Sequence, residues 1–433
     1  MTLPDGTIKQ VSPFNGTQVW TVPGRANRPF VNKDLPAEPI NHALDGYHCS
    51  FCEFRYLDSP PEVSRLVIDA DDPAAATTSG HHPGKDPDGT TRVREVRHVP
   101  ASELNSTFAT FRRVPNLFPI LPLHYWQANH GLALSPAAAA WHRDYLADPL
   151  GRDHLLSVAR RIAIASGLST DDWGALPPAD KLRRAETFFS SSHDLIIAHR
   201  HFSAGATSTD QLASSGTLTP DEHADYLRFT VEAAQSLQVD NPHARYVTIF
   251  QNWLRPAGAS FDHLHKQLAA IDQLPVQTEG ELHRLKNNPN LYWEYGVDYA
   301  ERQRLVIARN DHAIAFAGFG HRYPSIEVHS LASVGRPWDL DEHQLRGLSD
   351  LVHAVHVASG VQTPVNEEWH YQPTGIDLVS PVRVVVKWRT NNLAGFEGAT
   401  KIYLNTISPW ALRDRVMEAL NGKKSQLGDV ETA

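Results

Sequence analysis

The sequence predicts an α+β protein built from two halves that repeat one order of elements. A strand, a long amphipathic helix and a second strand follow one another between residues 193 and 253, and the same order returns between 304 and 391. A helix-rich segment precedes the first series. The chain has 433 residues, of which 41% are hydrophobic, and this is enough for a substantial core. We therefore expect two α+β halves duplicated at the level of elements, without an evident residue-for-residue repeat.

The first half begins with short strands and turn-rich connections. Residues 17–30 combine alternating Val and Trp with a Pro-Gly break, which is typical of a strand that runs into an arginine-bearing loop. Residues 69–91 are small and polar and predict a surface loop. Residues 106–123 favour extended structure on both sides of Pro115, because proline breaks a helix. Between about 130 and 190 the helical spacing of apolar residues predicts a helical insertion.

Strand patterns return after the insertion. Residues 193–202 have strand composition, and 219–238 form an amphipathic helix pattern with Thr219 as its N-cap, followed by proline. Residues 245–253 again predict a strand, and a loop then leads to the stretch FDHLHKQ at 261–267.

The second half contains strands at 304–319, a helix at 339–360 with Asp339 or Asp341 near its cap, and a strand at 381–391. The predicted divisions are a first half at 1–280, a second half at 281–415 and a polar tail at 416–433.

Composition excludes several classes of protein. The formal net charge of −9 argues against a broad basic surface for nucleic acid. No apolar stretch approaches the roughly 20 residues that span a bilayer, and the first residues lack a signal-peptide pattern. We therefore expect a cytoplasmic protein that binds neither nucleic acid nor membranes.

The chain has two cysteines, Cys49 and Cys52, in the sequence HCSFC. In a reducing compartment a C-x-x-C pair favours metal binding or redox activity over a structural disulfide. A tetrahedral zinc site would need histidine or carboxylate ligands from elsewhere in the chain. A pair of buried free thiols is the alternative.

The stretch HLHKQ aligns three polar side chains. In a strand, His263, His265 and Gln267 point to one face, while Leu264 and Lys266 point to the other. One imidazole can ligate a metal, and a second can attack an electrophilic phosphorus while an amide donor holds the phosphoryl oxygen. The alternative is a half-exposed strand with two solvated histidines.

The two clusters combine into one hypothesis. Two thiolates, His263 and a histidine from the HRH sequence at 199–201 would complete a closed four-coordinate zinc site, which leaves His265 free. Surface histidines beside Arg200 are the alternative for the HRH sequence.

Five motifs occur in a characteristic order, which is PFNGTQVWTVPGRANRP, CSFC with SPPE, VPNLFPIL, FQNWLRPAGASFDHLHKQ and AGFEGATKIYLNTISP. Together they resemble the galactose-1-phosphate uridylyltransferase family, a branch of the histidine-triad superfamily that also contains nucleotide-sugar and dinucleoside-polyphosphate phosphorylases. The resemblance covers most of the chain apart from the insertion. It implies two histidine-triad-like halves, each an antiparallel sheet with packed helices, plus a helical insertion in the first half.

The resemblance also implies two-step nucleotidyl transfer. His265 matches the nucleophile that takes a nucleoside monophosphate from a nucleotide sugar or related nucleoside diphosphate derivative, and Gln267 matches the amide that binds the phosphoryl oxygen. A sugar phosphate or similar phosphate-bearing acceptor then removes the nucleotide. The alternatives are a phosphorylase that uses inorganic phosphate on a nucleotide sugar or dinucleoside polyphosphate, and a zinc-stabilised nucleotide-binding module without turnover.

Further residues match family positions. Cys49, Cys52 and His263 match ligands of one structural Zn²⁺, with His201 the better match for the fourth ligand and His199 its rival. The positions around phosphates and nucleotide are Arg25, Arg28, Asn116, Asn252 and Ser260. Pairing of two subunits across the second half agrees with the family.

Three departures from the family pattern stand out. Lys266 replaces a small residue, so that it either alters the rim of the site or faces solvent. The helical insertion has no counterpart in common members and could cover the acceptor site. His370 matches a ligand of a second metal, but Lys387 and Arg389 occupy the paired positions, which argues against that metal. Two cations there could instead hold an anionic acceptor.

Overall fold

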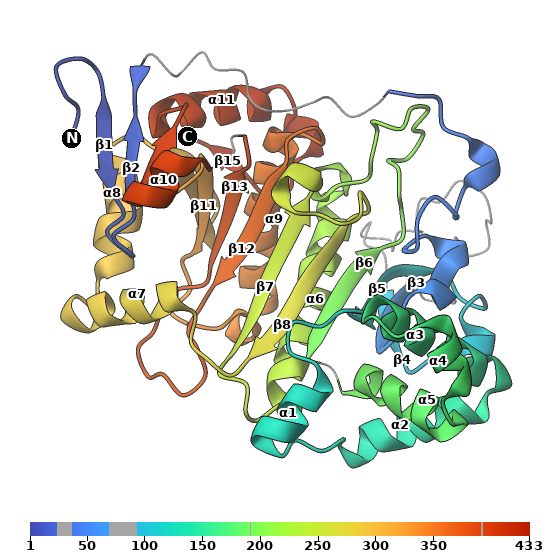
Figure 1. Cartoon of the computed structure of the whole chain (residues 1–433). Helices are drawn as coiled ribbons and strands as arrows, with labels where there is room; N and C mark the ends of the chain where they lie inside the picture. The colour runs from blue at the N-terminus through green and yellow to red at the C-terminus, as the bar shows by residue number, and fades with distance from the viewer. Residues whose placement is uncertain (24–36, 69–92, 191, 391–392) are drawn as a thin grey trace.

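The computed structural model describes residues 1–23, 37–68, 93–190, 192–390 and 393–433 (Figure 1). The expected loop at 69–91 lies outside the described residues. The fold is α+β and centres on a sheet of 12 strands. From one edge to the other, the strands are β15 (Glu431–Thr432), β9 (Val306–Arg309), β10 (Ala313–Ala317), β11 (Ser325–Ser330), β13 (Arg383–Trp388), β12 (Val365–His370), β7 (Tyr246–Trp253), β8 (His265–Ile271), β6 (His193–Ala198), β5 (Ala109–Pro115), β3 (Ser64–Ile68) and β4 (Val93–Arg97).

The two halves contribute equal and corresponding parts of this sheet. Reading outward from the centre, the first half supplies β7, β8, β6, β5, β3 and β4, and the second supplies β12, β13, β11, β10, β9 and β15. Within each half the pairings are antiparallel, as expected. The halves join where β7 pairs with β12, with Asn252 opposite Asn366. The duplicated halves therefore share one continuous sheet.

Three long helices lie against one face of the sheet, which we call the helix face (Figure 1). They are α6 (Pro220–Asp240), α9 (Glu342–Ser359) and α11 (Pro409–Asn421). Thr219 caps α6 in a reciprocal bond with Glu222, and Asp341 rather than Asp339 caps α9. Alternate strand residues such as Leu268 and Ala270 pack beneath these helices.

The opposite face of the sheet, the open face, is covered only in part. Helix α7 (Val276–Asn287) packs there through Leu282 and Leu285 against Phe14 and Tyr292. A short π-helical turn (Trp293–Val297) and α8 (Asp298–Arg302) follow it. A small sheet of β1 (Ile8–Val11), β2 (Gln18–Thr21) and β14 (Ile402–Asn405), with α10 (Gly395–Thr400) beside β14, lies at the second half.

The expected insertion is helical. After α1 (Leu123–His130) it consists of α2 (Pro136–Ala147), α3 (Pro149–Ala165), α4 (Thr170–Ala175), α5 (Pro178–Arg183) and a 3₁₀ segment (Arg184–Phe189). Ser135, Asp148 and Ser169 cap three of these helices with their side chains. The insertion has its own apolar cluster, which includes Trp141 and Phe188. It lies beside the first half, at the end of the sheet away from the second half (Figure 1).

The last residues are structured. The segment expected as a polar tail, 416–433, completes α11, whose Val416 and Leu420 are buried, and ends in β15, which pairs with β9. Among the described residues, none of the helices has the length and apolar composition needed to cross a bilayer.

Candidate functional site

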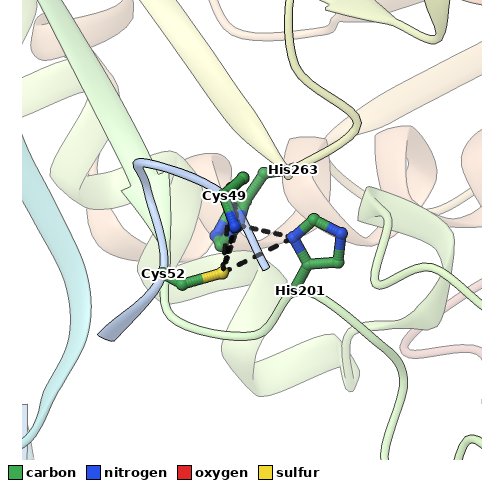
Figure 2. A group of neighbouring side chains, drawn as sticks. All are labelled: Cys49, Cys52, His201 and His263. Carbon is green, nitrogen blue, oxygen red and sulfur yellow. Dashed lines mark hydrogen bonds between the residues drawn. The ribbon is translucent and has the colours of Figure 1, made fainter. Parts of the chain in front are cut away.

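Four predicted ligand residues come together at the end of β6. Cys49 and Cys52 lie on the segment before a 3₁₀ helix (Glu53–Asp58), His201 follows β6, and His263 precedes β8. Figure 2 shows the two thiols and the two imidazoles directed at one point. Their four donor atoms lie within 4.8 Å of one another. His199 instead turns to the carbonyl of Thr110, so the geometry favours His201 over its rival.

The spacing of these donor atoms fits a tetrahedral metal. The two sulfurs are 3.7 Å apart, the two histidine Nδ1 atoms 3.3 Å, and Cys52 Sγ lies 3.6 Å from His201 Nδ1. Zinc bonds of about 2.3 Å to sulfur and about 2.0 Å to nitrogen give tetrahedral edges of roughly 3.7 Å and 3.3 Å. The four residues can therefore hold one zinc ion with no open coordination position.

Hydrogen bonds orient the buried ligand. His263 Nε2 donates to the carbonyl of Ala198 at 2.6 Å, so the lone pair is on Nδ1, which faces the two sulfurs. The hydrogen bond from Cys49 lowers the pKa of the Cys52 thiol. The same bond raises the pKa of Cys49. Cys52 thus carries the thiolate, and a bound cation would deprotonate its neighbour as well.

His265 begins β8 directly after the metal cluster. Its ring is buried, 5% exposed, and Phe51 packs edge-on against it with ring centroids 5.2 Å apart. Burial lowers the pKa of His265 to about 4, so the imidazole is neutral at pH 7. Nδ1 donates to the carbonyl of His263 at 2.7 Å, which places the lone pair on Nε2. Nε2 is therefore the nitrogen whose lone pair is available to a ligand.

Gln267 points to the same face of β8, and His193 fixes its amide. The backbone N–H of Ile120 donates to His193 Nδ1 at 3.2 Å, so the proton of this neutral ring is on Nε2. Burial lowers the pKa of His193, which agrees with a neutral ring. Nε2 then donates to Gln267 Oε1, 3.2 Å away. The NH₂ group of Gln267 is left to donate to a ligand.

The other predicted binding residues are placed differently. Asn116 follows β5, accepts the N–H of Phe118 and lies 3.2 Å from His193 through its amide nitrogen, so it belongs to the surroundings of Gln267. Ser260 is exposed on the loop between β7 and β8. Arg25 and Arg28 lie outside the described residues.

Asn252 lies beside His265. The antiparallel pairing of β7 with β8 extends as far as Phe250 opposite Gln267. Continued by two residues, the same register would bring Asn252 opposite His265. Both side chains then share the open face. A cavity of about 470 Å³ adjoins Asn252 on this face, and Thr248, Phe250 and Asn252 line it together with residues of the second half.

Lys266 contradicts the expectation that it forms part of the rim or faces solvent. Its side chain is completely buried on the helix face, where it forms an ion pair with Glu367 of β12. Gln251 accepts from the same ammonium at 3.3 Å, and the ring of Tyr226 on α6 lies beneath it. The strand alternation alone pointed to this outcome, because it places Lys266 opposite the reactive side chains.

Sequence reasoning missed three residues close to the predicted ones: His193, Asn366 and Glu367. His193 carried one usable signal, because it opens the strand that pairs with β8. Asn366 and Glu367 belong to the other half and approach β8 only through the pairing of β12 with β7. Their positions depend on a long-range register that the sequence does not display.

Comparison with solved structures supports the fold. An ADP-glucose phosphorylase from Arabidopsis thaliana, solved with bound ADP-glucose, superposes with a TM-score of 0.56 at 18% identity, over 95% of this chain and 98% of that one. A GalT-like protein from Arabidopsis thaliana gives a TM-score of 0.54 at 17% identity, with the same coverage of both chains. At this identity the likeness concerns the fold.

No curated protein matches the sequence. A family model described as a domain of unknown function, DUF4921, matches residues 3–431, which is nearly the whole chain. The chain therefore belongs to the DUF4921 family, and its fold is that of the GalT-like proteins.

Proposed function

We propose that the protein is a nucleotidyltransferase that works through a covalent nucleotidyl-histidine at His265. The observation that carries the proposal is the state of this imidazole. It is buried and neutral, its Nδ1 proton is anchored to the carbonyl of His263, and its Nε2 lone pair is available. An imidazole held in this tautomer is ready to attack phosphorus without prior loss of a proton.

In the first step, Nε2 of His265 attacks the α-phosphorus of a nucleotide sugar or related nucleoside diphosphate derivative. The N–P bond forms as the bond to the leaving phosphate oxygen breaks, and the leaving group departs as a phosphate. The NH₂ group of Gln267, oriented by His193, donates to a nonbridging oxygen whose charge grows in the transition state. Because an amide is no general acid, the intermediate waits for an acceptor rather than reacting with water.

The remaining predicted residues complete the proposal. Arg25 and Arg28 bind phosphates, and Asn116, Asn252 and Ser260 surround the nucleotide and phosphates. Cys49, Cys52, His201 and His263 hold a structural zinc ion, which supplies rigidity. His263 lies two residues before His265, so an ion bound there would hold in place the strand end from which His265 projects.

Inorganic phosphate as the acceptor is the second candidate. It is favoured by the similarity in fold to an ADP-glucose phosphorylase that extends over 95% of this chain. Both candidates share the covalent step and differ in what removes the nucleotide. A nucleotide-binding module without turnover would need neither the free Nε2 of His265 nor the oriented amide of Gln267.

The covalent step can be tested directly. Protein is incubated with ADP-glucose and UDP-glucose that carry a labelled α-phosphate, then denatured and assayed for bound label. We expect a base-stable, acid-labile adduct on the wild type, as befits a phosphoramidate, and at least a 100-fold slower formation in His265→Asn.

Arg309→Gln, which removes one exposed polar side chain of β9, is the control, and it should still form the adduct. Equal labelling of His265→Asn, or no labelling of the wild type by any nucleotide sugar or dinucleotide donor, would contradict the proposal.

A further inference from the structure

A row of polar side chains crosses the seam between the halves on the open face. His265 lies beside Asn252, Asn252 pairs with Asn366, and Asn366 pairs with Lys387. Neighbouring strands are about 4.8 Å apart, so Asn366 is roughly 10 Å from His265 along this row. The row therefore leads from the proposed nucleophile into the second half.

The amide side chains of Asn366 and Asn252 connect Arg389 by hydrogen bonds to the proposed nucleotide site. Arg389 Nη1 donates to Asn366 Oδ1 at 2.6 Å. Asn366 Nδ2 donates to Asn252 Oδ1 at 2.7 Å and to the carbonyl of Ala257 at 2.8 Å. Because Oδ1 of Asn252 is occupied, its NH₂ group is the part that remains to donate to a ligand. Arg389 thus sets the orientation of a donor next to His265.

Arg389 also carries a charge that the fold does not balance with an acid. Its guanidinium stacks on the ring of Tyr323 at 4.5 Å, and its Nε is buried without a hydrogen-bond partner. Among the described residues it has no carboxylate partner. Lys387, in contrast, pairs with Glu368, which also lies 3.7 Å from His370. Of Lys387 and Arg389, it is therefore Arg389 whose positive charge is left for an anionic ligand.

The cavities around Arg389 have room for a phosphate that carries a further polar group. The cavity of about 470 Å³ beside Asn252 adjoins a second one of about 560 Å³, and both are lined by Arg389 and Asn366. Gln277 and Glu368 line both cavities as well, and Thr248 and His370 line the first. These groups can donate to and accept from hydroxyls, so the lining favours a polyhydroxylated group attached to the anion.

We propose that these two cavities, at the junction of β7 with β12, bind the phosphate-bearing partner that exchanges with the nucleotide on His265. Arg389 and Asn252 bind the phosphate of this partner. The inference rests on the proposed function and names the acceptor as a phosphate dianion that carries a sugar-like group. In the exchange, an acceptor phosphate oxygen forms an O–P bond, the N–P bond to His265 breaks, and the electron pair returns to Nε2. The balance needs no further reactant.

The test isolates the acceptor step. Wild type and Arg389→Gln are loaded to completion with α-labelled nucleotide sugar and freed of donor by gel filtration. Discharge of the label is then followed against rising concentrations of glucose 1-phosphate and, separately, of inorganic phosphate. We expect the half-saturating concentration of both acceptors to rise about 10- to 100-fold in Arg389→Gln, because one charge-assisted contact is lost. Slow discharge by water alone should not change.

Three comparisons sharpen the result. Arg389→Lys keeps the charge but loses the fork and should fall between the wild type and Arg389→Gln. Arg309→Gln, which removes an exposed arginine of the second half, should match the wild type. Tighter half-saturation by glucose 1-phosphate than by inorganic phosphate supports the sugar-like group, and the reverse order overturns that part.

Equal acceptor dependence of Arg389→Gln and the wild type overturns the assignment of Arg389. So does a variant that folds, judged by melting temperature and zinc content, but cannot be loaded. A wild type that never forms the adduct contradicts the proposed function instead, so the two failures are distinguishable.

Discussion

At the scale of single residues, the proton on His193 Nε2 determines which end of the Gln267 amide faces a ligand. An amide such as that of Gln267 can turn either its oxygen or its NH₂ group towards a ligand. His193 settles the choice, because Ile120 occupies Nδ1 and leaves Nε2–H to donate to Gln267 Oε1. In the proposed mechanism His193 is therefore a positioning residue, since it would act on the phosphoryl group through Gln267.

We expect His193→Phe to lower kcat for nucleotidyl transfer by about 10- to 100-fold, because Gln267 then presents its amide in either orientation. KM for the donor should change less than threefold, since the substrate keeps its other contacts. Steady-state kinetics with the active donor checks this split, with melting temperature and zinc content as controls of folding. A rise in KM with unchanged kcat would show that His193 has a different role.

The sequence was informative about residues whose chemistry is local. The C-x-x-C spacing and the H-x-H-x-Q alternation predicted Cys49, Cys52 and His263 as ligands and His265 and Gln267 as the side chains of β8, because these patterns depend on short separations. His201 was preferred over His199 only through the family resemblance. His193 and Asn366 were not predicted, because their positions in the site depend on pairing between strands. Whether the named residues perform the proposed chemistry is what the adduct and zinc experiments decide.

At the scale of elements, the junction of β7 with β12 has charged side chains on the helix face and amide side chains on the open face. On the helix face, Lys266 of β8 and Glu367 of β12 form a buried ion pair across β7. His356 and Trp369 also donate to Glu367, at 2.8 Å and 2.6 Å. All of these groups are buried, so each depends on its partner to compensate for the free-energy cost of losing its hydration.

Lys266→Met should therefore lower the free energy of unfolding by about 3–5 kcal/mol, because it leaves an unpaired carboxylate inside the protein. The double variant Lys266→Met with Glu367→Gln should lose less than the single one, since the stranded charge is removed. Urea unfolding curves measure both. Lys387→Met is the matched control, because its partner Glu368 is 35% exposed, and it should cost about 1 kcal/mol or less. A similar loss in the two lysine variants would argue against the buried pair.

Most elements could be predicted, whereas their assembly could not. Helix starts at Thr219 and Asp341 follow from capping residues, and the strands at β7, β8 and β13 follow from composition. The join of β7 to β12 pairs residues more than a hundred positions apart. Only the tertiary packing of both halves determines such a pairing.

At the scale of the whole molecule, the metal cluster ties distant parts of the chain together. His201 and Cys52 are 149 residues apart, and His201 and His263 are 62 apart, with the helical insertion lying between Cys52 and His201. A bound ion would close these long loops and hold the start of β8 in place.

We expect about one zinc per chain in the purified wild type and close to none in Cys49→Ser, because three ligands bind far more weakly than four. The variant and the chelator-treated wild type should both melt at lower temperature, and added zinc should restore only the latter. Elemental analysis and thermal unfolding measure this, with His199→Gln as the control that keeps its zinc. Full zinc content in Cys49→Ser would overturn the assignment.

The continuous sheet also constrains how the protein can move. In many enzymes built from two parts, the parts rotate about a hinge and enclose the substrate. Here the backbone ladder runs from β7 to β12 through four registered residue pairs (Figure 1). A rotation of one half against the other would break that ladder, so access to His265 is left to motions smaller than a rotation of the halves. For the same reason we expect the two halves to lose their structure in one cooperative step.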